Sequence, residues 1–155
     1  MRIGTGYDIH RLEAGRELIL GGVRIDHPLG LEGHSDADVL THAVIDALLG
    51  AAALGDIGEH FPDSDPQWKG MSSLDLLELS ARLLEKAGYR VVNIDSTLIA
   101  EEPRLHLVLT EMQRNIARRL GLKRDVVNVK ATSPEGLGAL GRSHGIAAQA
   151  VALIE

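Results

Sequence analysis

Asp8 and His10 are the first residues of the chain whose types and spacing point to metal chemistry. They lie two positions apart within residues 3–10, a short segment with the composition of a strand. Alternate side chains of a strand point to the same face, so the carboxylate and the imidazole are expected side by side. Together they are suitable ligands for zinc or a similar divalent ion. The pair is a weak motif alone, and a third ligand has to come from elsewhere.

The next candidate ligands lie on a segment with helical periodicity. Asp38, His42 and Asp46 are four residues apart and form one polar stripe on an otherwise apolar helix. Carboxylates one turn away on each side would hold the imidazole in one tautomer. The alternative is an ordinary solvated helix face, but such faces more often include Lys or Arg. The spacing leaves open whether His34 or His42 completes the site with the first pair.

Composition limits the chemistry further. Three protein ligands would leave one corner of a tetrahedral zinc ion open, as in catalytic sites. The chain has 155 residues, a net charge of −6 and no cysteine. The charge argues against nucleic acid as a partner, and an anionic substrate would need a bound cation. No cysteine means no disulfides and no thiol nucleophile. No apolar stretch approaches the ~20 residues of a membrane span, which argues against a membrane partner.

The pattern of elements predicts a single α+β domain over residues 1–155, a mixed β-sheet with helices packed on one face. The first helix is expected to start with Ser35 or Asp36 as its cap and to end near Gly50 or Gly55. The final strand is expected to have both faces buried. The other expected elements are strands at 3–10, 89–100, 126–131 and 146–154, a hairpin at 18–25 around a Gly-Gly turn, helices at 73–87 and 104–120, and loops at 28–33 and 55–70.

Several blocks of the sequence match one known family in order and separation. They are GYDIH at 6–10, HSDADV at 34–39, HA at 42–43 with DAL at 46–48, GDIG at 55–58 with FPD at 61–63, and VNVKAT at 127–132. In these blocks the chain resembles the 2-C-methyl-D-erythritol 2,4-cyclodiphosphate synthase family over residues 1–155. The resemblance implies conversion of 4-diphosphocytidyl-2-C-methyl-D-erythritol 2-phosphate to the cyclic diphosphate with release of CMP, in the non-mevalonate isoprenoid pathway.

The resemblance also implies roles for individual residues. Asp8, His10 and His42 would bind Zn²⁺, or another divalent cation such as Mn²⁺, and Glu135 would bind Mg²⁺. These four would be the catalytic residues. The substrate-binding residues would be His34 and Ser35 at the erythritol phosphate, Asp56, Gly58, Phe61, Asp63 and Asp65 in a mobile loop, Ala100, Pro103, Arg104 and Leu105 around the cytidine, Thr132 and Ser133 near the phosphates, and Arg142.

The family resemblance extends to assembly and location. It implies a homotrimer with active sites between adjacent subunits and a small-molecule cytidine diphosphate substrate. It also implies a bacterial cytoplasmic location, or the plastid stroma if a transit peptide has been removed. Ala139 and His144 depart from the family pattern near the threefold axis, where members can bind isoprenoid diphosphates.

Other interpretations compete with these implied roles. Thr132 and Glu135 have the spacing of a capping box, in which Glu135 would only close a helix start. The protein as a whole could be a metal-dependent phosphohydrolase that uses zinc-bound water and gives a linear product. It could also be a non-catalytic trimeric metal- or isoprenoid-binding protein, for which a closed site with four ligands is expected.

Overall fold

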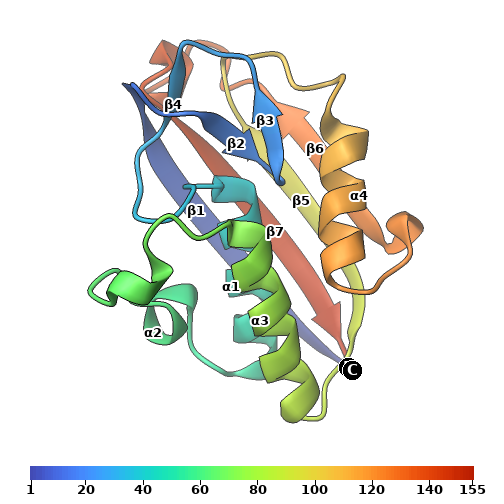
Figure 1. The fold of residues 1–155 in the computed structure, drawn as a ribbon. Helices are drawn as coiled ribbons and strands as arrows, with labels where there is room; N and C mark the ends of the chain where they lie inside the picture. Colours follow the sequence, from blue (N-terminus) through green and yellow to red (C-terminus); the bar gives the residue numbers. More distant parts are fainter.

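Five strands form one mixed sheet in the order β4-β1-β7-β5-β6, with β5 and β6 parallel and the other neighbours antiparallel. The computed structural model describes all residues, 1–155. The expected α+β architecture is confirmed, with the helices in front of the sheet in Figure 1. The strands are β1 Arg2–Ala14, β2 Leu18–Leu20, β3 Val23–Ile25, β4 Leu29–Leu31, β5 Val91–Ile99, β6 Val127–Thr132 and β7 Gly145–Ile154. The helices are α1 Val39–Ala52, α2 Ile57–His60, α3 Ser73–Lys86 and α4 Leu109–Arg119, with short 3₁₀ turns η1 Pro66–Trp68, η2 Arg124–Val126 and η3 Leu140–Arg142.

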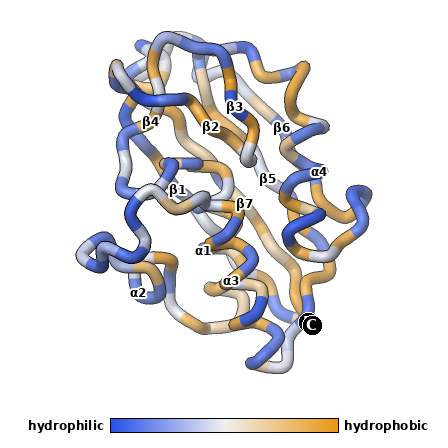
Figure 2. The backbone as a smooth tube through the Cα atoms, in the orientation of Figure 1, coloured by the Kyte–Doolittle hydropathy of each residue, from blue (hydrophilic) through white to orange (hydrophobic).

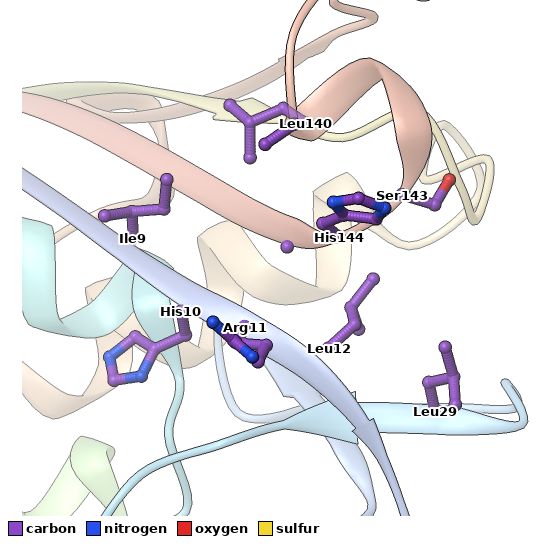
Figure 3. Close-up of a pocket in the computed structure, with 10 residues that line it drawn as sticks. Ile9, His10, Arg11, Leu12, Leu29, Leu140, Ser143 and His144 are labelled. Atoms are coloured by element: carbon purple, nitrogen blue, oxygen red, sulfur yellow. The ribbon is translucent and has the colours of Figure 1, made fainter.

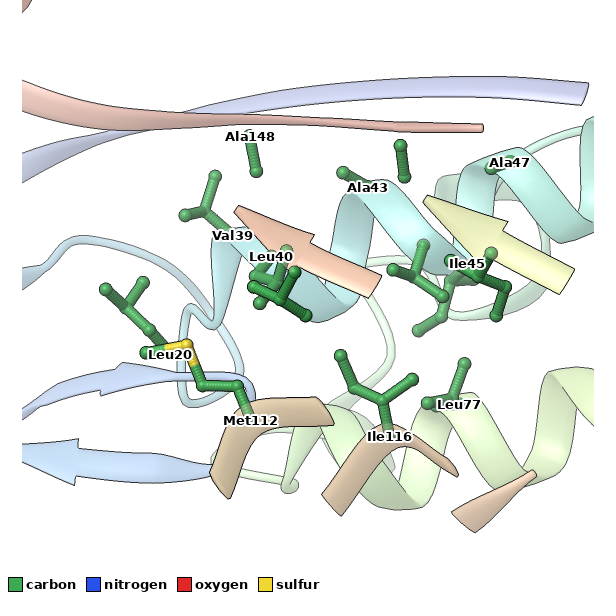
Figure 4. Close-up of a cluster of buried hydrophobic side chains, with 14 of the residues drawn as sticks. Leu20, Val39, Leu40, Ala43, Ile45, Ala47, Leu77, Met112, Ile116 and Ala148 are labelled. Carbon is green, nitrogen blue, oxygen red and sulfur yellow. The ribbon is translucent and has the colours of Figure 1, made fainter. Parts of the chain in front are cut away.

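Helix α1 is the centre of the core. It packs on β1 and β7 on one side and on α3 on the other, and eleven of its residues are buried. Figure 4 shows its apolar side chains between the sheet and the side chains of Leu77, Met112 and Ile116. In Figure 2 strand β7 is mostly hydrophobic, which agrees with its position in the middle of the sheet.

Two glycines let α1 approach the sheet closely. A β-carbon added to Gly4 would lie 2.1 Å from the Ala47 carbonyl oxygen, and one added to Gly6 would lie 1.9 Å from the Ala43 carbonyl oxygen. Real side chains never approach backbone so closely, so any other residue would push the helix away. The close approach brings α1 within reach of the side chains that follow on β1.

The sheet is covered on one face only. Alternate residues of β1 are exposed on the other face, including Ile3, Tyr7 and Ile9 at 70%, 56% and 50% exposure. On β7 Gln149 is exposed and Leu153 is only half-buried. The expectation that both faces of the final strand are buried is therefore wrong for this chain alone.

The first helix starts later than the sequence predicted. Its N-cap is Asp38, whose carboxylate accepts a hydrogen bond from the Thr41 N–H at 3.1 Å. Ser35 and Asp36 instead bind the backbone N–H groups of the turn before it, and Ala37 has a φ of 57° that no helix accommodates. Helix α1 ends at Ala52, and its C-cap is Ala53 in a left-handed conformation and not a glycine.

Other boundaries also differ from expectation. The third long helix begins at Leu109 and not at 104, because the buried Leu105 lies in a turn in which its carbonyl accepts from the Val108 N–H. The expected loop at 28–33 contains β4, which pairs with the end of β1. The expected loop at 55–70 contains α2 and η1. None of the helices combines the length and the apolar character needed to cross a bilayer.

Candidate active site

Three side chains from two elements converge beside the start of α1. Asp8 and His10 point from β1 toward the helix, and His42 comes from the first turns of α1. Asp8 Oδ2 is 2.9 Å from His10 Nε2 and 3.0 Å from His42 Nδ1, and the two ring nitrogens are 3.3 Å apart. The choice that spacing left open is resolved, because His42 and not His34 belongs to this cluster.

The cluster has the geometry of a divalent-cation site. Donor atoms of a tetrahedral zinc ion with bonds near 2.0 Å are about 3.3 Å apart, so the three atoms are already close to the required spacing. The side chains of Asp8, His10 and His42 are 25%, 19% and 12% exposed, so a bound ion would still face solvent on one side. One carboxylate and two imidazoles are a ligand set that zinc and similar ions accept.

The remaining ring nitrogens are held by the protein. His10 Nδ1 is hydrogen-bonded to the Glu32 carbonyl oxygen, which can only accept, so Nδ1 carries a proton there. His42 Nε2 lies 2.8 Å from Ser73 Oγ and 3.1 Å from Ser35 Oγ. Both rings are thus oriented so that the nitrogen that is not bound by backbone or serine faces Asp8, as in metal-ligating histidines.

The charges of the cluster are coupled. Burial acts to raise the pKa of Asp8, but the hydrogen bonds and charges of His10 and His42 outweigh it, and the pKa lies well below its usual range. Burial acts to lower the pKa of His10, but the hydrogen bond and charge of Asp8 raise it above 6.5. A cation would replace the proton that this arrangement favours.

The two carboxylates of the α1 stripe do not hold His42. Asp38 is fully buried and accepts hydrogen bonds from the Gly21 and Gly22 N–H groups at 2.9 and 2.7 Å, which fixes the β2–β3 turn to the helix start. Asp46 accepts from the Ile57 N–H at 2.8 Å and so holds the start of α2. Burial raises the pKa of both groups. The prediction that these carboxylates orient the imidazole is therefore wrong, since each has a structural partner.

The cluster opens into a cavity of about 370 Å³. His34 Nε2 and Trp68 Nε1 are buried in residues that line it and have no hydrogen-bond partner in the protein, so each could bind a substrate group. Phe61 packs edge-on against Trp68 with ring centres 5.1 Å apart. Of the residues expected to bind substrate, the cavity brings together His34, Ser35, Gly58, Phe61 and Asp63 with the three-residue cluster.

A second cavity of about 350 Å³ lies at the ends of β5 and β6. Its lining shares no residue with the first cavity. It is formed by the segments expected to contact the cytidine and the phosphates, and its lining includes Ala100, Pro103, Arg104, Leu105, Thr132 and Ser133. Within one chain the expected substrate site is therefore divided between two cavities.

Glu135 follows the second cavity in a turn and not in a helix. Its φ is 55°, and its N–H donates to Ser133 Oγ at 2.9 Å. The Glu101 carboxylate accepts from Ser133 Oγ and from the Gly136 N–H at 3.0 and 3.1 Å. No helix starts here, so the capping-box interpretation of Thr132 and Glu135 is not supported. The Glu135 side chain is exposed and free to bind a ligand.

The other expected substrate residues line neither cavity. Asp56 caps α2 by accepting from the Glu59 N–H, and Asp65 caps η1 by accepting from the Gln67 N–H. Arg142 ends η3, beside a third cavity of about 640 Å³ on the uncovered side of the sheet. Figure 3 shows that Ile9 faces Leu140 there, while His10 points to the opposite side of β1.

Sequence reasoning missed Ser73 and Trp68. Ser73 is the first residue of α3, and nothing in its spacing connects it to His42, 31 positions away. Trp68 carried a signal that could have been used, because it is the only tryptophan of the chain and lies in the loop that was expected to be functional.

Comparisons with known proteins identify relatives over the whole chain. A protein from Syntrophomonas wolfei, named 2-C-methyl-D-erythritol 2,4-cyclodiphosphate synthase, is 61% identical over 155 residues, 100% of this chain and 99% of its own length. A solved synthase of the same name, with a form bound to CDP, is 39% identical with a TM-score of 0.91 over 99% of this chain and 100% of that one. The bifunctional IspDF of Campylobacter jejuni matches with a TM-score of 0.95 and 42% identity, over 99% of this chain but 42% of that longer one.

The family model agrees with these similarities over the whole sequence. The model of the YgbB family matches residues 1–155. Relatives of high identity are cyclodiphosphate synthases, and the solved structures share the sheet and the helices described above. The chain belongs to the YgbB family.

Proposed function

We propose that this protein converts 4-diphosphocytidyl-2-C-methyl-D-erythritol 2-phosphate into 2-C-methyl-D-erythritol 2,4-cyclodiphosphate and CMP. It would be a phosphorus–oxygen lyase of isoprenoid biosynthesis. Relatives named 2-C-methyl-D-erythritol 2,4-cyclodiphosphate synthase, which match 97–100% of this chain, support this proposal. The observation that carries the proposal is the cluster of Asp8, His10 and His42 at the edge of a cavity whose other wall is made by His34, Ser35 and the 57–63 segment.

The reaction needs positioning more than it needs a protein nucleophile. An oxygen of the substrate's 2-phosphate attacks the β-phosphorus, and the bond from that phosphorus to CMP breaks, with CMP leaving with the electron pair. Asp8, His10 and His42 would hold Zn²⁺ or Mn²⁺, and Glu135 would hold Mg²⁺. When bound, these cations supply positive charge that offsets the repulsion between the approaching phosphates. Correct positioning alone can supply ~7–11 kcal/mol in intramolecular reactions.

The protein's own groups would orient the two ends of the substrate. His34 and Ser35 would bind the erythritol phosphate, and the segment containing Asp56, Phe61 and Asp63 would cover the methylerythritol part, together with Gly58 and Asp65. The nucleotide would occupy the second cavity, between residues 100–105 and the Thr132–Ser133 turn. CDP in structures of two relatives supports a cytidine nucleotide as the partner of this fold.

We propose further that the active protein is a homotrimer with sites between subunits. Two observations support this assembly. The first is that the two cavities share no lining residue, so that different subunits could bind the two ends of one substrate. The second is the uncovered face of the sheet, where large apolar side chains are exposed in the single chain. A cytoplasmic location remains a prediction from the resemblance.

A phosphorus NMR time course with the diphosphocytidyl substrate tests the function. The cyclic diphosphate and CMP are expected to appear together, and a chelator is expected to stop both. A linear phosphate product would favour the metal-dependent phosphohydrolase, and no CMP release would favour a non-catalytic binding protein.

The same assay tests the metal cluster through His42→Ala. This variant is expected to lose at least ~100-fold in rate, the scale seen when one preorganised charge-stabilising group is removed. His27→Ala is the matched control, because the hydrogen bonds of that ring are with the Leu29 backbone and the residue lies outside this cavity. Near-normal turnover by His42→Ala, with metal content measured, would contradict the proposed site.

A further inference from the structure

The hydroxyl of Ser73 connects His42 to the carboxylate of Asp36, which lies outside the cluster of Asp8, His10 and His42. Ser73 is fully buried, and its Oγ is 2.8 Å from His42 Nε2. The same Oγ donates to Asp36 Oδ1, while Asp36 Oδ2 accepts from the Ser73 backbone N–H at 3.0 Å. The Asp36 carboxylate therefore accepts hydrogen bonds from both the hydroxyl and the backbone N–H of Ser73.

This arrangement decides the direction of the hydrogen bond to His42. A hydroxyl has one proton to donate, and an ionised carboxylate can only accept. Because Ser73 gives its proton to Asp36, its oxygen can only accept from His42, so His42 Nε2 carries the ring proton. In the neutral ring that would bind a cation, the lone pair is then on Nδ1, the nitrogen that faces Asp8 at 3.0 Å. A cation bound there takes the place of the hydrogen bond between Nδ1 and Asp8.

Ser35 alone would leave the tautomer undecided. Its Oγ lies 3.1 Å from His42 Nε2 and accepts from the Ala37 N–H, but no carboxylate takes its proton. It could therefore donate to His42 or accept from it. For His10, by contrast, the Glu32 carbonyl oxygen fixes the tautomer directly, because it accepts the proton of Nδ1. Ser73, whose proton is taken by Asp36, acts on His42 Nε2 as a pure hydrogen-bond acceptor, as the Glu32 carbonyl acts on His10 Nδ1.

We propose that Asp36 and Ser73 are positioning residues that fix His42 as the Nε2–H tautomer and thereby set the affinity of the cluster for a divalent cation. The inference rests on the proposed function, since it takes the cluster of Asp8, His10 and His42 as a metal site. Carboxylate–histidine arrangements of this kind orient metal ligands and raise their basicity. Here a serine hydroxyl lies between the carboxylate and the ring.

The pair is held rigidly by the surrounding backbone. The Asp36 N–H donates to the Met71 carbonyl at 3.2 Å, and the Gly70 N–H donates to the His34 carbonyl at 3.0 Å. Ser72, the N-cap of α3, makes no side-chain cap, so Asp36 also supplies the acceptor for the start of that helix. These hydrogen bonds tie the start of α3 to the segment before α1 and so hold Ser73 next to His42.

Zinc affinity of the metal-free protein, measured by competition with a chromophoric chelator, tests the proposal. Ser73→Ala is expected to weaken zinc binding roughly 10- to 100-fold, the usual effect of removing a group that orients a ligating histidine. Ser80→Ala is the matched control: it also removes a fully buried hydroxyl from α3, but that hydroxyl donates only to the Leu76 carbonyl. It is expected to leave zinc affinity unchanged.

Asp36→Asn provides a second arm, in case Ser73→Ala does not fold. Its side-chain N–H group can donate to Ser73 Oγ, which frees the hydroxyl proton to point at His42 and favours the wrong tautomer. Zinc affinity is expected to fall, and the visible absorption of the Co²⁺-loaded protein is expected to change in both variants but not in Ser80→Ala.

The outcomes separate the two levels of inference. Wild-type zinc affinity in Ser73→Ala, or in Asp36→Asn, would overturn the role of the pair while leaving the metal site intact. Failure of the wild type to bind zinc, cobalt or manganese would contradict the metal site itself and the pair with it. Loss of affinity in both variants, with circular dichroism like that of the wild type, would support the proposal.

Discussion

Gly6 of β1 lies in direct contact with the backbone of Ala43 in α1, one residue after His42. A β-carbon on Gly6 would be 1.9 Å from the Ala43 carbonyl oxygen. The absence of a side chain at this point brings α1 close enough for His42 to reach Asp8, two residues further along the strand. The glycine is thus a condition for the cluster of Asp8, His10 and His42, although it has no functional side chain.

The first prediction follows from this contact. Gly6→Ala is expected to push α1 from the sheet, to lower the free energy of unfolding by ~1–3 kcal/mol as overpacking does, and to weaken zinc binding. Thermal unfolding and zinc titration measure the two effects. Gly50→Ala is the control, because a β-carbon there meets only the Thr5 carbonyl at 3.9 Å and should stabilise the helix slightly. If Gly6→Ala is destabilised but binds zinc like the wild type, the close packing at Gly6 is not needed for the zinc site.

The second prediction concerns the pH dependence of the metal-free protein. The pKa of Asp8 is lowered from 3.8, so its stabilising effect is present above that value and is lost as the pH falls through the folded pKa. The pKa of His10 is raised from 6.5, so its effect is present below that value and is lost as the pH rises through the folded pKa. The pair should therefore stabilise the fold most between pH 3.8 and 6.5.

Melting temperatures in the presence of chelator measure this window. The difference between the wild type and Asp8→Asn is expected to be largest near pH 5 and to shrink as the pH rises above 6.5 and passes through the raised pKa of folded His10. A difference that stays constant over this range would mean that Asp8 and His10 do not titrate as a pair.

The third prediction concerns Glu135. Because the turn that contains it leaves its carboxylate exposed, Glu135→Gln is expected to change the fold little and to raise the magnesium concentration needed for half-maximal activity by about tenfold, the effect of losing ~1.4 kcal/mol of binding. Glu85→Gln, an exposed glutamate on α3, is the control. If Glu135→Gln needs the same magnesium concentration as the wild type, Glu135 does not bind magnesium and is only a residue of the turn.

The fourth prediction concerns assembly. Tyr7→Lys places a charge on the uncovered face of the sheet, where burial against a second copy would leave it unpaired. We expect a smaller mass by light scattering and loss of most activity, since the proposed sites need two subunits. Ala87→Lys, at the exposed end of α3, should keep the mass of the wild type. A trimer in Tyr7→Lys would place the interface elsewhere.

Much of the fold followed from periodicity, but the start of α1 did not. The apolar spacing of α1 and α3 and the Gly-Gly turn of the hairpin are local signals, and these elements were predicted correctly. The cap of α1 was predicted too early because Ser35 and Asp36 are good caps in isolation. Their side chains are used instead on the preceding turn and on Ser73, contacts that only the tertiary structure creates.

In the candidate site, too, the local relations between residues were predictable and the tertiary contacts were not. The strand alternation that pairs Asp8 with His10 is a local property, whereas the i, i+4 relation of Asp38 to His42 was misleading. A buried acceptor binds whichever donors surround it, and for Asp38 these are the amides of a distant hairpin. Ser73 could not be found from spacing, because its contact with His42 depends on how α3 packs against α1.

Successive side chains of β1 alternate between the two faces of the sheet, and each set has a different role. Its even-numbered positions Asp8 and His10 face the helix, and its odd-numbered positions Tyr7 and Ile9 face the uncovered side. Insertion or deletion of a single residue early in this strand would exchange the two sets, turning the ligands outward and the apolar groups inward. The candidate metal site and the proposed subunit interface therefore depend on the same register of β1, and a shift by one position would disrupt both.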